Sequence, residues 1–536
     1  MPYNEERFIF GNENGEIDPL LQECYINRAP KNISIIVGRW GTGKTAYLLA
    51  DNNHLTKTLR EVDEKICRDW YLSESSLNTD QLIDAFYALD ERKYDRYLKE
   101  LWKAEIVRRT ALVLSYLHHT YDETVSPSWE YIKDFSSVPD ANKTVWKQIP
   151  VFMRMFKNID DGQVAAAHDA KASLDSLVSD RLFDHVNNCL VEIQNNKNYP
   201  IIAIEPIETP LSAIEKEGSI AQKVVSALVN TFQNDFQLSE KQHIKVKISI
   251  PWHRFSSLTL NLPQKIRQYK HTMTWDESKL REFISRRITW EFNRVKRQHS
   301  VKAGTDAWAT LFSPTVHNAY CQPRVNEDSF KYILRHTHYR PREVQRIARY
   351  AVSVCADRIG KSEDYVLRGV GGVRVDGAHI RDAVSRYCRE ATEDLIEEGR
   401  RRFPNLQDIV DNIKGLGVPF SEDDLEQRLI PGIGLSEALE TLWESGILGA
   451  EIACKKNYEI EPFKHLLPDE NYCYHRNADN KELHRWYFFE YNWEGDLTEI
   501  LNRYGKNDKL MISLIVHSRT FENLGVHVKR SWPYGL

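Results

Sequence analysis

The chain has 536 residues, a length that suggests about three domains, and its formal net charge is −5. Hydrophobic residues make up 41% and charged residues 28%, which is globular composition and excludes a disordered chain or one that binds polyanions through bulk charge. The cysteines form no C-x-x-C pair, and the N-terminal residues MPYNEERFIF do not read as a signal peptide. No run approaches the roughly 20 apolar residues of a membrane helix. We therefore expect a cytoplasmic protein with reduced thiols and no membrane contact.

The first predicted element is a short strand, Ile33 to Gly38, which follows an N-terminal segment, residues 1–30. Its sequence ISIIVG is apolar and rich in β-branched residues, the pattern of a strand buried on both faces. The glycine-rich sequence GRWGTGKT follows at once, and TAYLLADNN continues with a helical pattern. Strand, glycine loop and helix therefore succeed one another directly.

This glycine-rich sequence matches the P-loop pattern G-x-x-x-x-G-K-[ST] in the strand-to-helix context that the motif requires. Glycines let backbone N–H groups curl around phosphate oxygens, and the following helix adds the positive end of its dipole. We expect Lys44 to reach the β- and γ-phosphates and the Thr45 hydroxyl to bind Mg²⁺. The predicted nucleoside-triphosphate site consists of Gly38, Arg39, Trp40, Gly41, Thr42, Gly43, Lys44 and Thr45.

Helical patterns fill most of the next stretch, about residues 67–194, where apolar residues recur at spacings of three and four. Two more apolar strands follow, Tyr199 to Glu208 and His243 to Trp252, with a helical pattern between them. Strands that alternate with helices imply a parallel sheet. We expect an α/β nucleotide-binding core, residues 31–270, that carries the helical stretch as an insertion.

Two glutamates at the end of the second strand are candidates for the acidic half of the site. Glu205 follows four apolar residues, and Glu208 comes three residues later. A P-loop site needs an acid at the end of a neighbouring strand to hold the Mg²⁺ shell. We expect Glu205 to bind Mg²⁺ through water and Glu208 to lie near the γ-phosphate; the alternative is a strand that ends in solvated acids. His253 and Arg254, after the third strand, are either a γ-phosphate sensor or a polar strand end.

Two arginines in the sequence RPRE open another predicted helix, Tyr339 to Ala356, in which Pro341 occupies the first turn. Arginine is suited to bridging phosphates in a closing lid. We expect Arg342 to be the lid sensor of the γ-phosphate, with Arg340 the second candidate. The alternative is a pair of surface arginines held in ion pairs.

The C-terminal part combines short helices with aromatic strands. SEALETLWESGILG predicts a helix and a turn, while YCYHRN and HRWYFFEYNW predict strands. We expect the aromatic residues of the last strand to lie in the core, because aromatics dominate core burial; the alternative is a surface that binds a partner. His336 and His338 have no cysteine or carboxylate partners at metal-site spacing, so we expect packed or solvated histidines.

Together these segments resemble the AAA+-like P-loop ATPases of the STAND and origin-recognition groups, in particular bacterial stand-alone members with a C-terminal winged helix. The matching segments, in chain order, are GRWGTGKT, IIAIEPIE, KISIPWHR, TWDESKLREFISRRI, WATLFSP, HYRPREVQRI and LWESGILG. The resemblance implies a P-loop NTPase fold with a parallel sheet and a helical insertion. It also implies a helical lid at residues 271–395, a winged-helix-like domain at 396–495 and a C-terminal tail at 496–536.

The same resemblance implies a molecular switch that binds and hydrolyses ATP with Mg²⁺, self-associates, and acts with a protein partner or effector, as members do in bacterial stress and phage defence. The family and the absence of a guanine-specifying N-K-x-D sequence favour ATP over GTP. Glu205 stands where the family has Asp, and Pro206 stands where many related ATPases place a catalytic Glu. We therefore expect slow or partner-stimulated hydrolysis.

Basic residues lie among aromatics in three stretches, which suits contacts to nucleic-acid phosphates and bases. They are Arg286, Arg287, Arg294, Lys296 and Arg297; Arg400, Arg401 and Arg402; and Lys455, Lys456, Arg476 and Arg485. Solvated helix faces are the alternative explanation. Two further functions thus stay open: an ATP-regulated protein that binds double-stranded DNA through its winged helix, and a scaffold for a separate effector subunit.

Overall fold

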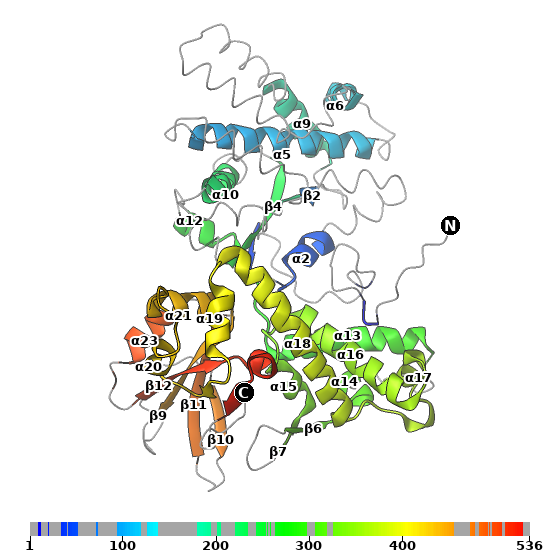
Figure 1. Cartoon of the computed structure of the whole chain (residues 1–536). Helices are drawn as coiled ribbons and strands as arrows, with labels where there is room; N and C mark the ends of the chain where they lie inside the picture. Colours follow the sequence, from blue (N-terminus) through cyan, green and yellow to red (C-terminus); the bar gives the residue numbers. More distant parts are fainter. Residues whose placement is uncertain are drawn as a thin grey trace. The chain divides into compact units, whose positions relative to one another are not determined.

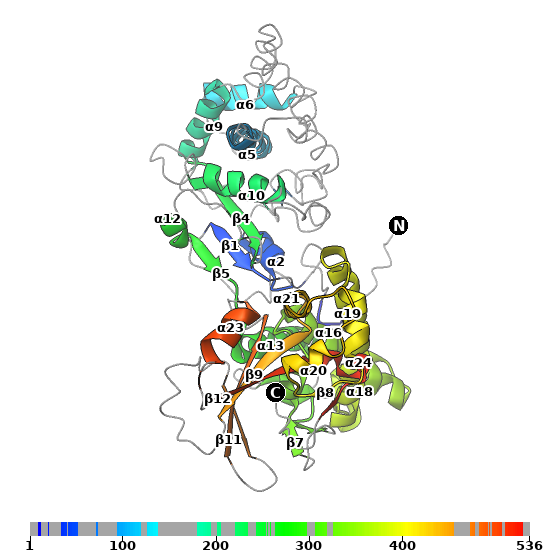
Figure 2. The ribbon, with the colours of Figure 1, turned by 60° about the vertical axis from the view of Figure 1, so that its left-hand side comes forward.

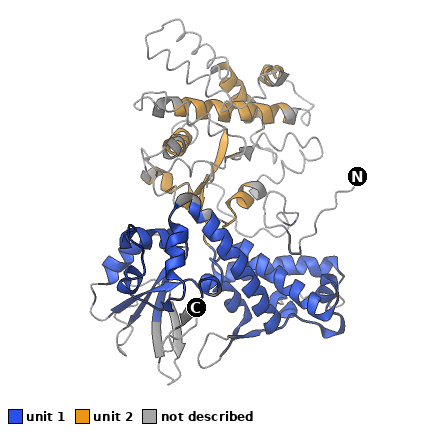
Figure 3. Cartoon of the chain, viewed as in Figure 1, with its two compact units in different colours: residues 1–14, 18–26, 275–536 blue, residues 15–17, 27–274 orange. Residues whose placement is uncertain are grey.

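The chain forms two compact units in the computed structural model (Figure 3). Unit 1 comprises residues 1–14, 18–26 and 275–536, and unit 2 comprises residues 15–17 and 27–274. Each unit contains a β-sheet and buried apolar residues of its own. The residues that the structure describes are 9–11, 20, 34–39, 41–51, 71–72, 94–118, 126–137, 180–193, 201–204, 220–233, 243–252, 255, 258, 263–296, 306–318, 325–454, 472–476, 482–490, 493, 496–505, 507 and 510–528.

Unit 2 is built on a parallel sheet with the strand order β2-β3-β4-β1-β5. The strands are β1 (Ile35–Gly38), β2 (Tyr71–Leu72), β3 (Ile201–Ile204), β4 (Lys245–Pro251) and β5 (Lys270–Thr272). Strand β1 lies between β4 and β5, and its four residues are all buried (Figure 2). The predicted α/β class with a parallel sheet is confirmed, and the apolar runs are those of strands covered on both faces.

The helices of unit 2 include one long helix that is surrounded by others. They are α2 (Lys44–Asp51), α5 (Tyr94–His118), α6 (Pro127–Ser137), α9 (Asp180–Glu192), α10 (Ile220–Thr231) and α12 (Pro263–Arg267). Figure 2 shows α5 end-on, in contact with α6, α9 and α10. The sequence predicts helices throughout residues 67–194. The structure differs in one place, because this stretch also contributes the short strand β2, which pairs with β3. A strand of two residues is too short to give an alternating pattern.

The first part of unit 1 is a helical layer around one apolar core. Its helices are α13 (Glu277–Arg294), α14 (Ala307–Leu311), α15 (Ser329–Leu334), α16 (Pro341–Ile359), α17 (Glu363–Arg368) and α18 (Gly377–Arg402), and a hairpin of β6 (Thr315–Asn318) and β7 (Val325–Asp328) joins them. The Asp276 side chain caps α13 by accepting a hydrogen bond from Lys279 N at 2.8 Å. Helix α16 runs from Pro341 to Ile359 rather than from Tyr339 to Ala356, and Pro341 occupies its first turn, as the RPRE sequence predicts.

The second part of unit 1 is an antiparallel sheet with the strand order β10-β11-β9-β12, packed against short helices. Its elements are α19 (Leu406–Ile413), β8 (Gly417–Val418), α20 (Glu422–Glu426), α21 (Leu435–Glu444), β9 (Leu448–Cys454), β10 (Tyr472–Arg476), β11 (Glu482–Phe489), α23 (Leu497–Tyr504), β12 (Leu510–Val516), η9 (Ser518–Thr520), α24 (Phe521–Leu524) and β13 (His527–Val528) (Figure 1). Strand β12 comes from the segment assigned above to the tail, and it pairs along β9. The aromatic side chains of β11 are buried, which confirms that prediction; they are Trp486, Tyr487, Phe488 and Phe489. Within the described ranges, no helix has the length and apolarity that a membrane crossing requires.

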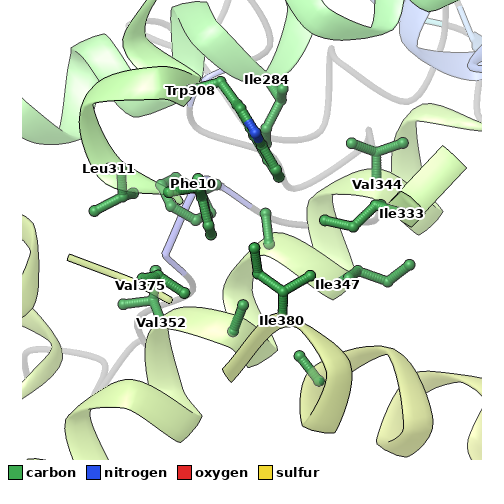
Figure 4. Close-up of a cluster of buried hydrophobic side chains, with 14 of the residues drawn as sticks. Phe10, Ile284, Trp308, Leu311, Ile333, Val344, Ile347, Val352, Val375 and Ile380 are labelled. Carbon is green, nitrogen blue, oxygen red and sulfur yellow. The ribbon is translucent and has the colours of Figure 1, made fainter. Parts of the chain in front are cut away.

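Residues near the N-terminus are anchored in the helical core of unit 1 (Figure 4). The Phe10 side chain is fully buried, although its φ of 65° is unusual for a residue with a side chain. Three buried side chains bind the backbone here: Phe10 N donates to Glu291 Oε1 at 3.1 Å, Arg287 Nη1 donates to Phe10 O at 2.6 Å, and Gln345 Nε2 donates to Gly11 O at 2.6 Å. Helices α13 and α16 therefore form an N-terminal clamp, the side chains of Arg287, Glu291 and Gln345.

We expect Phe10→Ala to lower the free energy of unfolding of unit 1 by about 3 kcal/mol, because it removes a buried ring and keeps a Cβ at positive φ. Phe10→Gly loses the same ring but adopts this φ freely, so it should be at least as stable as Phe10→Ala. Urea unfolding, followed through the amide exchange of α13, measures both differences. Wild-type stability of Phe10→Ala would contradict the anchoring of residue 10 in the core.

Candidate functional site

The segment Gly38–Thr45, here named the glycine loop, joins β1 to α2 at the carboxyl end of the sheet. Gly41 and Gly43 have φ values of 72° and 89°, a region that glycine adopts without strain. At Gly38 an added Cβ would lie 2.6 Å from Thr42 Oγ1, so the loop returns closely over the end of the strand. The two positive φ values and the close approach at Gly38 explain why glycines stand at these positions.

Two side chains of the glycine loop point back to one carbonyl group. Lys44 Nζ donates to Arg39 O at 3.1 Å, and Thr42 Oγ1 donates to the same oxygen at 2.8 Å. Both residues are buried, whereas Thr45, on the first turn of α2, is partly buried. A buried ammonium group at the start of a helix gives the loop a positive local potential. Trp40 lies outside the described residues.

The carboxyl ends of neighbouring parallel strands lie at the same edge of the sheet as the glycine loop. Gly38 pairs with Pro251 of β4, and Val37 pairs with Thr272 of β5. Strand β3, which is next but one to β1 in the sheet, ends at Ile204, so Ile204 lies at this edge. Glu205 and Glu208, like His253 and Arg254, lie outside the described residues. Their roles stay predictions.

A second buried cation lies on the sheet beneath α2, and sequence reasoning missed it. Lys247 of β4 donates from Nζ to Tyr47 Oη at 3.4 Å, and Nζ lies 5.1 Å from the centroid of the Tyr47 ring. Burial lowers the pKa of Lys247 to about 8 and raises the pKa of Tyr47 to about 12. The only signal in the sequence is a lysine at the third position of the strand KVKISIP, which also fits a strand with one solvated face.

The two predicted lid arginines lie at the start of α16 in unit 1. Arg342 is exposed and forms no ion pair with any residue that the structure describes. Arg340 is the N-cap residue of α16 and is partly buried, with Nη1 3.9 Å from Glu343 Oε1. Arg342 therefore offers its guanidinium to solvent, whereas Arg340 lies beside a carboxylate of its own helix.

Residues Thr337–Glu343, here named the arginine turn, are held from inside by Glu343. One carboxylate oxygen of Glu343 accepts a hydrogen bond from His338 N at 2.6 Å, and the other accepts from Arg519 Nη1 at 2.8 Å. Tyr339 has a φ of 54°, and its N–H donates to Thr337 Oγ1 at 3.2 Å. Positive φ at a tyrosine is unfavourable, so these hydrogen bonds maintain a strained backbone. Sequence reasoning missed Glu343, which resembles an ordinary acid in the first turn of a helix.

Three histidines are buried around this turn. His336 and His338 are packed rather than solvated, and the ring of His338 meets the ring of His517 edge to face, with centroids 4.6 Å apart. Burial, helped by Arg519, lowers the pKa of His517 to about 3, and burial with Arg335 lowers the pKa of His336 well below its ordinary range. Among the described residues, no group of three or more His, Cys, Asp or Glu side chains could hold a metal ion.

The predicted basic contact residues are largely engaged with other groups of the chain. Arg286 pairs with Glu282 at 2.5 Å, Arg294 pairs with Glu291 and Asp364, and Arg287 is buried in the N-terminal clamp. Arg485 forms a buried ion pair with Glu451 on the neighbouring strand. The acidic partners Glu282 and Glu291 lie three or four residues away on α13, whereas Asp364 lies on α17 and Glu451 on an adjacent strand, which composition alone does not reveal.

The remaining basic candidates do not form a described contact face. Arg400 donates to Gln407 Oε1, and Lys296 is exposed at the end of α13. The side chains of Arg401, Arg402 and Arg476 and the residues Arg297, Lys455 and Lys456 lie outside the described part of the chain.

We expect the stability of unit 1 to fall with decreasing pH, because His336 and His517 are held neutral in the folded state. The unfolded chain binds protons near pKa 6.5 and the folded chain only near pKa 3 at His517, so stability is lost as pH falls between these values. The slope should approach about 1.4 kcal/mol per pH unit for each histidine. Urea unfolding at a series of pH values measures this dependence of the free energy of unfolding on pH. The variant His517→Asn should have a flatter slope between about pH 6.5 and 5, because it removes one of the two groups. An unchanged slope in this variant would contradict a neutral, buried His517.

Comparisons of the chain with protein-family models, with curated proteins and with solved structures found no match in any of the three. The geometry of the glycine loop and the arginine turn is therefore the basis for inferring what the chain does.

Proposed function

We propose that the chain is a P-loop ATPase of the AAA+-like type, in which bound ATP and Mg²⁺ set the state of a molecular switch in the cytoplasm. One observation carries the proposal. The glycine loop, with two positive φ values, follows strand β1, which lies between two parallel neighbours. The side chains of Lys44 and Thr42 converge on Arg39 O beside the start of α2. This arrangement offers donors and positive potential to a phosphate chain.

The donors of the glycine loop fit phosphate oxygens. Lys44 Nζ and Thr42 Oγ1 already meet at Arg39 O, and a phosphate oxygen would replace that carbonyl as their acceptor. The backbone N–H groups at the start of α2 would bind the same anion, because the first turn of a helix leaves them without intrahelical partners. Lys44 would also neutralise part of the charge that develops during phosphoryl transfer.

The metal would be Mg²⁺, a hard cation that keeps several waters and takes few protein ligands. The Thr45 hydroxyl would be one ligand, and Glu205 would bind through water at the carboxyl edge of β3. Mg²⁺ supplies charge neutralisation at the β- and γ-phosphates. Glu208 would orient the attacking water, and Pro206, directly after Glu205, leaves no second carboxylate at that position. We infer slow turnover that a partner stimulates.

The lid arginines would complete the site when unit 1 meets a nucleotide. Arg342 is the first candidate, because its guanidinium is exposed and engages no described carboxylate. Arg340 is the second, because Glu343 competes for its charge. A planar guanidinium can bind two phosphate oxygens at once, and this makes arginine sensitive to the presence of the γ-phosphate.

Surface charge in the second part of unit 1 favours a protein partner, such as a separate effector subunit, over DNA. Helices α20 and α21 and the segments beside them expose acidic side chains, and a DNA-reading helix requires the opposite charge. The exposed acids are Asp408, Asp411, Glu422, Asp423, Glu426, Glu437 and Glu440. This charge fits a basic protein surface, and the family resemblance suggests a role in bacterial stress or phage defence.

We expect Lys44→Ala to weaken ATP binding at least about tenfold, because it removes the cation at the phosphates. Glu205→Gln should retain ATP binding but lose most turnover, since Mg²⁺ coordination is weakened while the glycine loop is intact. Calorimetric titration with ATP and Mg²⁺, beside a phosphate-release assay, separates the two effects. Thr56→Ala, a substitution remote from the motif in sequence, is the control. Equal ATP affinity of Lys44→Ala and the wild type would contradict the proposal.

We expect ATP to promote self-association, because sites of this kind often take an arginine from a neighbouring subunit. The mass of the purified chain in light scattering should increase when ATP and Mg²⁺ are added to Glu205→Gln, which holds ATP longer. ADP is the control nucleotide. A constant monomer mass with ATP would contradict self-association and leave the protein-partner proposal to be tested by co-purification.

A further inference from the structure

The arginine turn is held by two contacts from a part of the chain far away in sequence. Glu343 and Arg519 are 176 residues apart, and both side chains are buried. Arg519 Nη2 also donates to Ala391 O of α18 at 2.8 Å, so the guanidinium joins α16, α18 and η9. A lysine could not make both contacts in this geometry, because its single ammonium lacks the planar fork of arginine.

The second contact comes from the turn that follows α21. Gly446 has a φ of 74° and lies against the His338 ring, where an added Cβ would be 2.8 Å from His338 Cε1. Its N–H donates to Trp443 O at 2.9 Å, which ties the turn to the end of α21. The backbone of His338 in turn donates to Glu343, so both contacts act on the same few residues.

We propose that Arg519 and Gly446 position the arginine turn, so that the second part of unit 1 sets where Arg340 and Arg342 project. Neither residue is catalytic, because each acts through another residue: Arg519 through Glu343 and Gly446 through His338. The consequence for recognition of the γ-phosphate rests on the proposed function. Its structural content, the control of the turn, does not depend on nucleotide binding.

Positioning has a physical basis in the strain of the turn. Tyr339 at a φ of 54° returns to an ordinary backbone conformation once its surroundings loosen, and Arg340 and Arg342 follow it in the chain. Arg519 supplies the charge that lets the Glu343 carboxylate stay buried and bound to His338 N. Displacing either Arg519 or the His338 ring therefore releases the turn.

The test compares two glycines with nearly the same backbone. Gly446→Ala introduces a Cβ against His338, whereas Gly415→Ala, at a φ of 71°, introduces one with nothing within 4 Å. Both variants carry the same backbone strain, so their difference isolates the contact with the turn. Arg519→Lys is the third variant, which keeps the charge and loses the planar fork that reaches Glu343 and Ala391 O together.

Amide hydrogen exchange of the full-length chain measures directly how firmly the arginine turn is held. Peptides that cover residues 336–346 should exchange about tenfold faster in Gly446→Ala and Arg519→Lys than in Gly415→Ala. Equal exchange of this segment in Gly446→Ala and Gly415→Ala would overturn the inference. So would an increase spread evenly over all of unit 1, since that result indicates general destabilisation.

Titration with ATP and with ADP measures whether the position of the arginine turn affects recognition of the γ-phosphate. The ratio of ATP to ADP affinity should fall about fivefold in Gly446→Ala and Arg519→Lys and stay at the wild-type value in Gly415→Ala, because only ATP carries the γ-phosphate. Fast exchange with an unchanged ratio would overturn the assignment of the turn to γ-phosphate recognition. A wild-type chain that binds neither nucleotide would refute the proposed function, and the exchange experiment would then decide the positioning alone.

Discussion

The buried carboxylate of Glu343 is the group on which the arrangement of unit 1 depends. A carboxylate removed from water is strongly unfavourable unless charged or hydrogen-bonding partners surround it. Here one partner is local, the N–H of His338, and the other is Arg519 from the far end of the chain. The second part of unit 1 must therefore be folded before the start of α16 can take its observed form.

The N-terminal clamp follows the same physical rule. Glu291 is buried, and its carboxylate accepts hydrogen bonds from the N–H of Phe10 and from the guanidinium of Arg294. Arg287 binds the carbonyl oxygen of Phe10 beside it. Such paired charges add little net stability compared with apolar side chains, but removing one partner is costly. Their contribution is to specify which distant segments meet. In both cases a carboxylate on a core helix selects one partner segment from another part of the chain.

The features that the sequence predicts are those formed by residues adjacent in the chain. The strand, the glycine loop and the start of α2 are adjacent in the chain, so their spacing alone identifies them, and Pro341 likewise marks the start of α16. Contacts between residues such as Glu343 and Arg519 leave no pattern, because no short window contains both. The sequence likewise does not reveal that Arg287 and Arg485, predicted to contact nucleic acid, bind groups of the chain itself, since their backbone or acidic partners come into reach only in the folded chain. Glu205 and Glu208 lie outside the described residues, and their part in the site stays a prediction.

The anchoring of Phe10 has a consequence for the order in which the chain is completed during synthesis. Glu291, the partner of the Phe10 N–H, follows 281 positions after Phe10, and Gln345, the partner of Gly11 O, follows 334 positions after Gly11. The ribosome therefore releases all of unit 2 before the clamp exists. Domains fold as units while they emerge. Unit 2 can thus form its sheet and glycine loop before the residues that bind Phe10 have been synthesised, and Arg519 is synthesised later still. Unit 2, which carries the proposed nucleotide site, is therefore synthesised before the residues of unit 1 that would respond to a nucleotide.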